Sequence, residues 1–123
     1  MLNNNLYTIS SFEDQAGAIS GTIELNAAHK IFEGHFPGQP VLPGVCMLQI
    51  IKELTEKATG KKLFLNDAAQ CKFLSMVDPV QTPSLIVAIN YQQPDAATIT
   101  INGTLKNDTA TFFKINAQLA ITC

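Results

Sequence analysis

Residues 34–60 read GHFPGQPVLPGVCMLQIIKELTEKATG. The first half is rich in proline, and in the second half apolar residues recur at regular intervals. Each proline locks its own φ and restricts the residue before it, so we expect a stiff loop without regular structure over residues 27–44. Apolar side chains then recur at helical spacing from Met47 onward. Pro43 suits the first turn of a helix, and Gly60 suits the position just after its end. The stretch therefore predicts one helix over residues 44–59.

Most of the remaining chain has the alternation and the β-branched composition of strands. We expect strands over residues 6–12, 18–25, 63–66, 70–77, 84–91, 98–105 and 111–121. Asn107 and Asp108 lie between the last two, where a hairpin turn is expected. One helix cannot provide the crossover connections that a parallel sheet needs. The sequence thus predicts an α+β fold, in which an antiparallel sheet packs one face against the helix.

The composition restricts the kinds of partner. A chain of 123 residues is expected to form one domain, residues 1–123. Charged residues make up only 15%, which indicates an apolar area buried against another subunit, as in a homodimer or higher oligomer. All eight basic residues are lysines, so the chain has no guanidinium group to read phosphates or base edges. Nucleic acid is therefore not expected as a partner.

Cysteine spacing and hydropathy indicate the compartment. Cys46, Cys71 and Cys123 are widely spaced and form no CxxC pair, so neither a zinc site nor a redox dithiol is expected. The first residues lack the basic and apolar segments of a signal peptide. No apolar stretch approaches the ~18 residues of a membrane span. We expect a cytoplasmic protein with reduced thiols and no membrane span.

His35 and Gly44 are the candidates for chemistry. The prolines around His35 hold its imidazole in place, as a catalytic base requires. Gly44 brings an unobstructed N–H to the positive end of the helix dipole, where it can bind an oxyanion or a polarised carbonyl. A base and an oxyanion donor together suit the removal of a proton next to a thioester carbonyl.

Residues 34–45 resemble the GHFPGxPxxPGV loop of the β-hydroxyacyl-acyl-carrier-protein dehydratases. The resemblance implies the hot-dog fold, an antiparallel sheet wrapped around one central helix, in a dimer with active sites at the subunit interface. It implies a lyase of fatty acid biosynthesis that needs no cofactor or metal. His35 would be the base and Gly44 the carbonyl-binding amide. Phe36, Pro43 and Val45 would contact the substrate, a thioester of acyl carrier protein or coenzyme A.

The sequence departs from this family pattern at the acid. The family carries Glu or Asp fourteen positions after the histidine, where this chain has Gln49, and Gln four residues later, where it has Glu53. An amide has no acidic proton, so Gln49 cannot act as a general acid. We therefore expect weak dehydration of 3-hydroxyacyl thioesters to trans-2-enoyl thioesters, and expect Gln49→Glu to raise it. Leu74 and Ser75 replace basic residues of the family, which weakens the prediction that a carrier protein docks there.

Each candidate also has a plainer interpretation. His35 and His29 would be loop residues, and Gly44 would serve only close packing. Gln49 would be solvated, Glu53 a surface carboxylate and Cys46 a small buried apolar residue. Two other functions remain open: a hot-dog thioesterase in which Glu53 activates water, and a non-catalytic acyl-binding subunit paired with an active homologue.

Overall fold

The computed structural model describes residues 5–32 and 41–122, with the backbone alone described at residues 66–69. The elements of this part follow one another as β1 (Tyr7–Gln15), β2 (Ala18–Leu25), the 3-10 helix η1 (Lys30–Phe32), α1 (Gly44–Thr59), β3 (Lys62–Phe73), β4 (Ser84–Asp95), β5 (Thr98–Lys106) and β6 (Thr111–Thr122).

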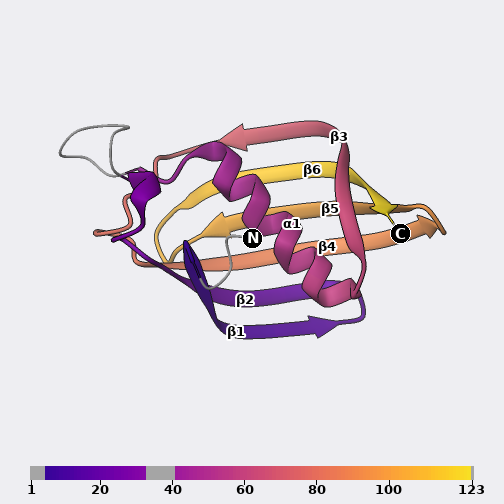
Figure 1. Cartoon of the computed structure of the whole chain (residues 1–123), viewed down its shortest axis with the longest axis horizontal. Helices are drawn as coiled ribbons and strands as arrows, with labels where there is room; N and C mark the ends of the chain where they lie inside the picture. The colour runs from indigo at the N-terminus through magenta and orange to yellow at the C-terminus, as the bar shows by residue number, and fades with distance from the viewer. Residues whose placement is uncertain (1–4, 33–40, 123) are drawn as a thin grey trace.

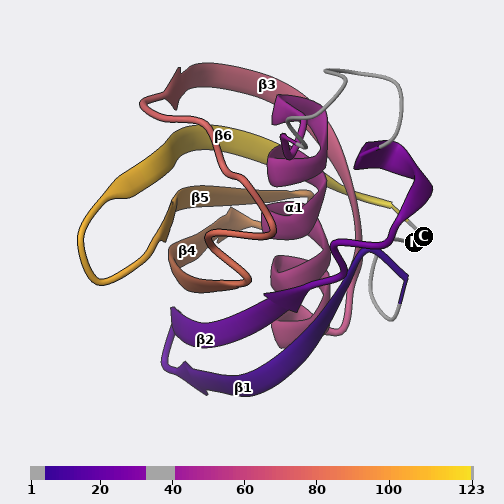
Figure 2. The ribbon, with the colours of Figure 1, turned by 90° about the vertical axis from the view of Figure 1, so that its left-hand side faces the viewer.

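The strands form one antiparallel sheet in the order β1-β2-β4-β5-β6-β3. α1 lies diagonally across one face of this sheet (Figure 1). In the view turned by 90°, β1 and β2 curl around one side of α1 and β3 curls around the other (Figure 2). The predicted α+β fold, an antiparallel sheet wrapped around one central helix, is confirmed.

Local backbone signals set both ends of α1. Pro43 has φ −63° and ψ 149°, so it occupies the cap position just before the first helical residue rather than the first turn itself. At the other end, Gly60 takes the left-handed φ of 69° that favours glycine, and its N–H donates to the Glu56 carbonyl. The Glu56 side chain then accepts a hydrogen bond of 2.8 Å from the Leu63 N–H, which ties the helix end to β3.

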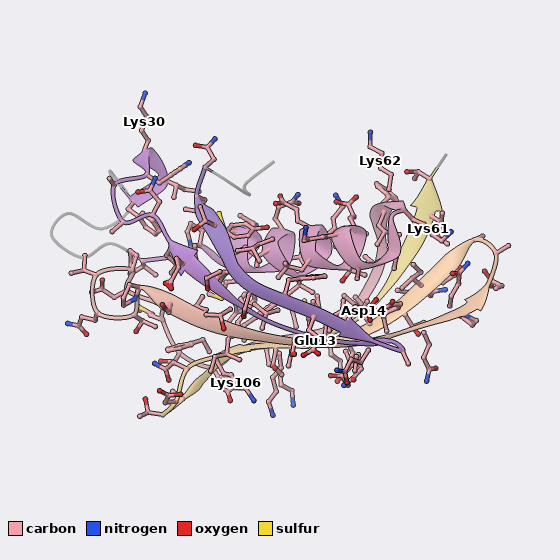
Figure 3. The ribbon with its side chains drawn as sticks, turned by 90° about the horizontal axis from the view of Figure 1, so that it is seen from below. Glu13, Asp14, Lys30, Lys61, Lys62 and Lys106 are labelled. Atoms are coloured by element: carbon pink, nitrogen blue, oxygen red, sulfur yellow. The ribbon has the colours of Figure 1, made fainter. Side chains whose placement is uncertain are left out.

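The core lies between α1 and the concave face of the sheet. Met47, Ile50, Ile51 and Leu54 of α1 are each at most 3% exposed. The buried side chains of the central strands include Leu85, Val87, Ile89, Ile99, Ile101, Leu105, Ile115 and Leu119. Burial of each contributes roughly 1.5–3 kcal/mol relative to exposure. Polar side chains such as Lys106 point from the opposite, convex face, as Figure 3 shows.

Two predictions of local structure need correction. The expected strands over residues 63–66 and 70–77 are replaced by one strand, β3, which ends at Phe73, so residues 74–77 are not in a strand. The register of β3 against β6 shifts between Leu65 and Asp67 and again between Asp67 and Gln70. Such bulges interrupt the alternation of buried and exposed residues from which a strand is predicted. The loop before the helix also contains regular structure, because residues 30–32 form η1. The hairpin turn at Asn107 is confirmed: its N–H donates to the Ala110 carbonyl and its Oδ1 accepts from the Ala110 N–H.

Candidate active site

An apolar pocket lies where α1 begins. It has a volume of about 560 Å³ and is lined by Val41, Leu42, Gly44, Met47, Phe73, Leu74, Ser75 and Met76. The Phe73 ring covers Gly44 so closely that a Cβ on Gly44 would lie 2.6 Å from Phe73 Cε1. A side chain at position 44 would thus have to displace the Phe73 ring. The pocket therefore has an apolar wall and lies beside the start of α1. The first N–H groups of a helix have no carbonyl partner within that helix.

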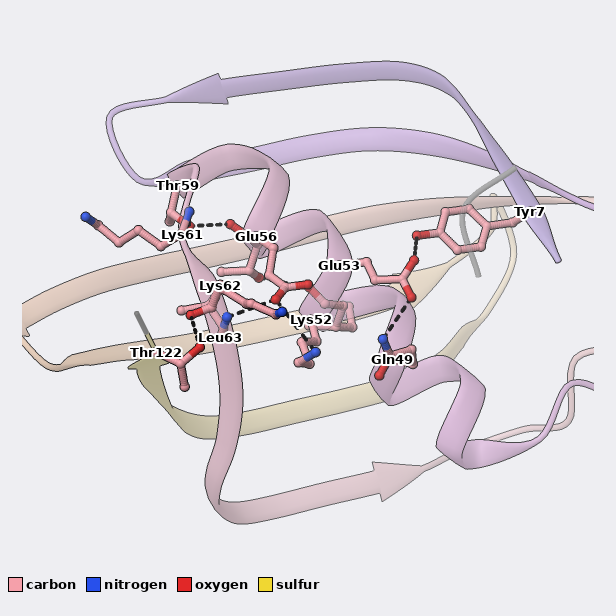
Figure 4. A network of polar contacts seen from close by, with 12 residues as sticks. Tyr7, Gln49, Lys52, Glu53, Glu56, Thr59, Lys61, Lys62, Leu63 and Thr122 are labelled. Atoms are coloured by element: carbon pink, nitrogen blue, oxygen red, sulfur yellow. Dashed lines mark hydrogen bonds and ion pairs between the residues drawn. The ribbon is translucent and has the colours of Figure 1, made fainter. Parts of the chain in front are cut away.

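A buried carboxylate lies further along the same helix. Glu53 is 5% exposed, and both of its oxygens accept hydrogen bonds (Figure 4). Gln49 Nε2 donates to Oε2 at 2.8 Å from one turn earlier in α1. The Tyr7 hydroxyl donates to Oε1 at 2.8 Å from β1. A carboxylate removed from water must be compensated by such donors.

The Tyr7 phenol is a permanent donor in this group. Burial, then the hydrogen bond to Glu53, then the charges of Glu53 and Glu56 raise the pKa of Tyr7 above its ordinary value. All of these causes favour the neutral phenol over the phenolate. Tyr7 is 1% exposed and therefore stays protonated, with its hydrogen directed at Glu53, across the physiological pH range.

The predicted site residues fall in different places. His35 and Phe36 lie outside the described residues. Gly44 lines the apolar pocket, whereas Val45 is 76% exposed and absent from the lining. Pro43 is half-buried and caps the helix without a side-chain hydrogen bond. In the described part of the chain, Pro43 is thus the residue that directly precedes α1.

Gly44 and Glu53 do not meet within one chain. They are nine residues apart in α1, which corresponds to about 13 Å along the helix axis. Gln49 and Glu53, by contrast, are hydrogen-bonded to each other. Within one chain, the pocket at the start of α1 and the Glu53 carboxylate are therefore separate features.

Some of the plainer interpretations are confirmed and others are wrong. Cys46 is 4% exposed, and burial raises the pKa of its thiol, so it is a small apolar core residue rather than a nucleophile. His29 is a loop residue whose Nδ1 accepts from the Ile31 N–H at 3.0 Å. Glu53 is not a surface carboxylate. Gln49 is half-buried rather than solvated, and it donates to Glu53, which Tyr7 of β1 contacts from the other side.

The sequence analysis missed Tyr7 altogether. A tyrosine at the start of a strand carries no motif, and its partner Glu53 is 46 residues away. One signal was available: a buried tyrosine needs a partner for its hydroxyl, and Tyr7 lies two residues before Ile9 in an alternating strand. That signal predicts that a partner exists without saying which.

No group of three or more His, Cys, Asp or Glu side chains in the described part of the chain is placed to hold a metal ion. Within residues 5–32 and 41–122, no helix is both long enough and apolar enough to cross a membrane.

A curled antiparallel sheet wrapped around one helix (Figure 2) is the hot-dog fold. The match of residues 11–112 to the family model described as ApeI dehydratase places the chain in the ApeI-like dehydratase family.

Individual relatives agree with this membership. A 3-hydroxyacyl-[acyl-carrier-protein] dehydratase FabZ of Rickettsia conorii is 28% identical over 114 residues, which cover 86% of this chain and 79% of that protein. Among solved structures, the dehydratase heterocomplex ApeI:P from Xenorhabdus doucetiae contains a chain similar at a TM-score of 0.73 and 22% identity, over 91% of this chain and 96% of that one. A thioesterase from Haemophilus influenzae has the same fold, with a TM-score of 0.67 and 12% identity over 97% and 80% of the two chains.

Proposed function

We propose that this protein dehydrates 3-hydroxyacyl thioesters carried by an acyl carrier protein and releases trans-2-enoyl thioesters. The observation that carries the proposal is the buried Glu53 carboxylate on the helix that follows the His35 loop. It supplies, one turn later, the carboxyl group that Gln49 lacks. Similarity to FabZ dehydratases supports the reaction and the carrier-bound substrate.

The roles follow from the chemistry of each group. His35 takes the proton from C2 of the substrate, and the Gly44 N–H binds the thioester oxygen as negative charge builds on it. Glu53, in its protonated form, gives a proton to the C3 hydroxyl, which leaves as water while the C2–C3 double bond forms. Gln49 holds the carboxyl group through its hydrogen bond. Phe36, Pro43 and Val45 remain proposed substrate contacts.

The apolar pocket is the proposed place for the acyl thioester. Its wall of Val41, Leu42, Met47 and Met76 suits an alkyl chain or the pantetheine arm. Because Gly44 and Glu53 lie about 13 Å apart along one helix, we propose that a complete site combines residues of two chains. A homodimer is the simplest such assembly, and the cytoplasmic location expected from the sequence belongs to the same proposal.

Thioester hydrolysis is the second candidate, and one observation favours it. Both Glu53 oxygens accept hydrogen bonds, which stabilises the ionised carboxylate. An ionised carboxylate activates water, whereas dehydration requires the protonated acid. Pairing with an active homologue is the third candidate, for which the ApeI:P heterocomplex is the structural parallel.

Mass spectrometry of 3-hydroxyacyl-carrier substrates after incubation with the purified protein separates these candidates. Loss of water from the carrier-bound chain supports dehydration, and release of the free 3-hydroxy acid supports hydrolysis. His35→Ala should reduce dehydration by ~10²–10⁴-fold, the usual contribution of a general base. Turnover that is unchanged in His35→Ala would contradict the assigned base. Product formed only after a homologous dehydratase is added would favour the non-catalytic subunit.

A further inference from the structure

The Tyr7–Glu53 contact connects the first strand with the helix that carries the site. Tyr7 is among the largest fully buried side chains, and its hydroxyl makes a 2.8 Å hydrogen bond to a carboxylate 46 residues away. In Figure 4 the phenol reaches Glu53 from β1, while Gln49 reaches it from within α1. Two donors from different elements thus hold the two oxygens of one carboxylate.

We propose that Tyr7 is the positioning residue for Glu53: its buried hydroxyl fixes the rotation of the carboxylate and stabilises the ionised form. The inference rests on the proposed function of Glu53, because Tyr7 acts through that side chain. The terminal torsion of a glutamate is soft and broad, so the carboxylate can rotate unless donors hold it. Tyr7 donates to Oε1 while Gln49 donates to Oε2, and the two directions together restrict that rotation.

The donor is matched to this task. A phenol whose pKa is raised by burial and by the neighbouring carboxylates does not ionise beside Glu53. Glu56 is the other acidic group that acts on this phenol, and Lys52 balances it through a 3.7 Å ion pair. Lys57, also on α1, lies over the Phe12 ring of β1 at 5.3 Å from its centroid. Because the Tyr7 phenol stays neutral, the strength of its hydrogen bond should set the pH at which Glu53 takes up a proton.

A second tyrosine provides a matched control. Tyr91 of β4 also donates its hydroxyl to a carboxylate, Asp14 Oδ2 of β1 at 2.7 Å, but this pair is exposed and spans the intervening strand β2. Tyr91→Phe removes the same chemical group and the same type of hydrogen bond as Tyr7→Phe. Because the chain has two tyrosines, Tyr91→Phe also leaves Tyr7 as the only phenol.

The test is a carboxyl ¹³C NMR titration of Glu53, assigned by loss of its signal in Glu53→Gln, together with the pH dependence of turnover. In Tyr7→Phe the Glu53 midpoint should move to higher pH, because the ionised form has lost a donor. The pH–rate limb that reports Glu53 should move with it. On the low-pH plateau, where Glu53 is protonated in both proteins, kcat should fall about tenfold or more with little change in KM, because the acid is no longer held in position. Tyr91→Phe should match the wild type in all three.

Fluorotyrosine keeps the test decisive if Tyr7→Phe does not fold. Incorporation into the Tyr91→Phe chain makes the Tyr7 phenol a stronger donor, so the Glu53 midpoint should move to lower pH and the ¹⁹F signal should follow the same titration. A Glu53 midpoint unchanged in folded Tyr7→Phe, or unchanged by fluorination, overturns the inference. Absence of turnover in the wild type would instead count against the proposed function, and the titration would still decide the role of Tyr7.

Discussion

Gln49 and Glu53 form an amide–carboxylate pair in which each member depends on the other. The amide donates to Glu53 Oε2 at 2.8 Å, and the carboxylate needs this donor because it is 5% exposed. The sequence alone led to the expectation that Gln49→Glu would raise activity by adding an acid. The hydrogen bond argues against that expectation, because the substitution would place a second carboxylate directly against that of Glu53.

We predict that Gln49→Glu destabilises the fold at neutral pH by about 1–3 kcal/mol, the usual cost of leaving a buried acceptor without its donor. Repulsion raises the pKa of one carboxyl in the folded state, so the loss should be greatest above that pKa and should shrink as pH falls towards 5. Denaturant unfolding of wild type and variant at pH 5 and pH 8 measures the difference.

The double exchange Gln49→Glu with Glu53→Gln is the control for this prediction. It restores an amide–carboxylate pair in the order that the dehydratase family uses, so stability and turnover should recover relative to either single variant. A double variant that is as unstable as the sum of the two singles would show that the pair is not coupled.

α1 packs over the centre of β5 at a position that has no side chain. A Cβ built on Gly103 would lie 3.3 Å from Ile51 Cδ1 and 3.4 Å from Ile89 Cγ1. Gly103 is buried and lies between Ile101 and Leu105 on the inward face of its strand. The spacing between helix and sheet, and with it the position of Gln49 and Glu53, depends on this one small residue.

Gly103→Val should therefore overpack the core and cost about 1–3 kcal/mol of folding free energy. Gly103→Ala should cost less, because its contacts are tight by only a few tenths of an ångström. Gly60→Ala serves as a control of a different kind: nothing lies within 4 Å of its Cβ, and its cost comes only from the left-handed φ of 69°. Thermal unfolding of the three variants checks the order, and a Val variant as stable as the Ala variant would contradict the close approach.

The two edges of the sheet differ in how readily they could pair with another chain. β1 is interrupted by a register shift between Ile9 and Ser11 and carries charged residues, of which Glu13 and Asp14 are labelled in Figure 3. β3 is 12 residues long and exposes Phe64 at 59% and Phe73 at 57%. A long edge strand with exposed aromatic side chains is a site for strand pairing, whereas charges and bulges protect an edge.

We predict that the protein is a dimer in solution and that β3 contributes to its interface. A stable obligate interface buries roughly 2,000 Å² or more, and sedimentation should show two chains at micromolar concentration. Phe64→Lys should favour the monomer because it places a charge on the apolar edge. Thr8→Lys, which adds the same charge to the β1 edge, should leave the assembly intact. A monomeric wild type would exclude a site shared between two chains.

The elements whose boundaries were predicted correctly are those with local signals. Residues 44–59 form α1 because the proline before it and the glycine after it restrict only their own backbone. β2 spans Ala18–Leu25 as expected, since its alternation is uninterrupted. β3 was divided in two because its bulges depend on the register against β6, a strand about 50 residues later in the chain. The roles of the candidate site residues stay predictions, whereas the interpretation of Glu53 as a surface carboxylate was wrong, because Glu53 is buried.

The amino-acid sequence by itself determined the fold class, the helix and the loop-to-helix motif that indicates the family, because backbone propensity and alternation act over a few residues. It did not determine which polar groups meet. A helical projection assumes one apolar face towards the sheet, but the sheet curls around α1 and brings Tyr7 of β1 against Glu53. That contact depends on the twist of the whole sheet and on two residues 46 positions apart, so it exists only once the chain has folded.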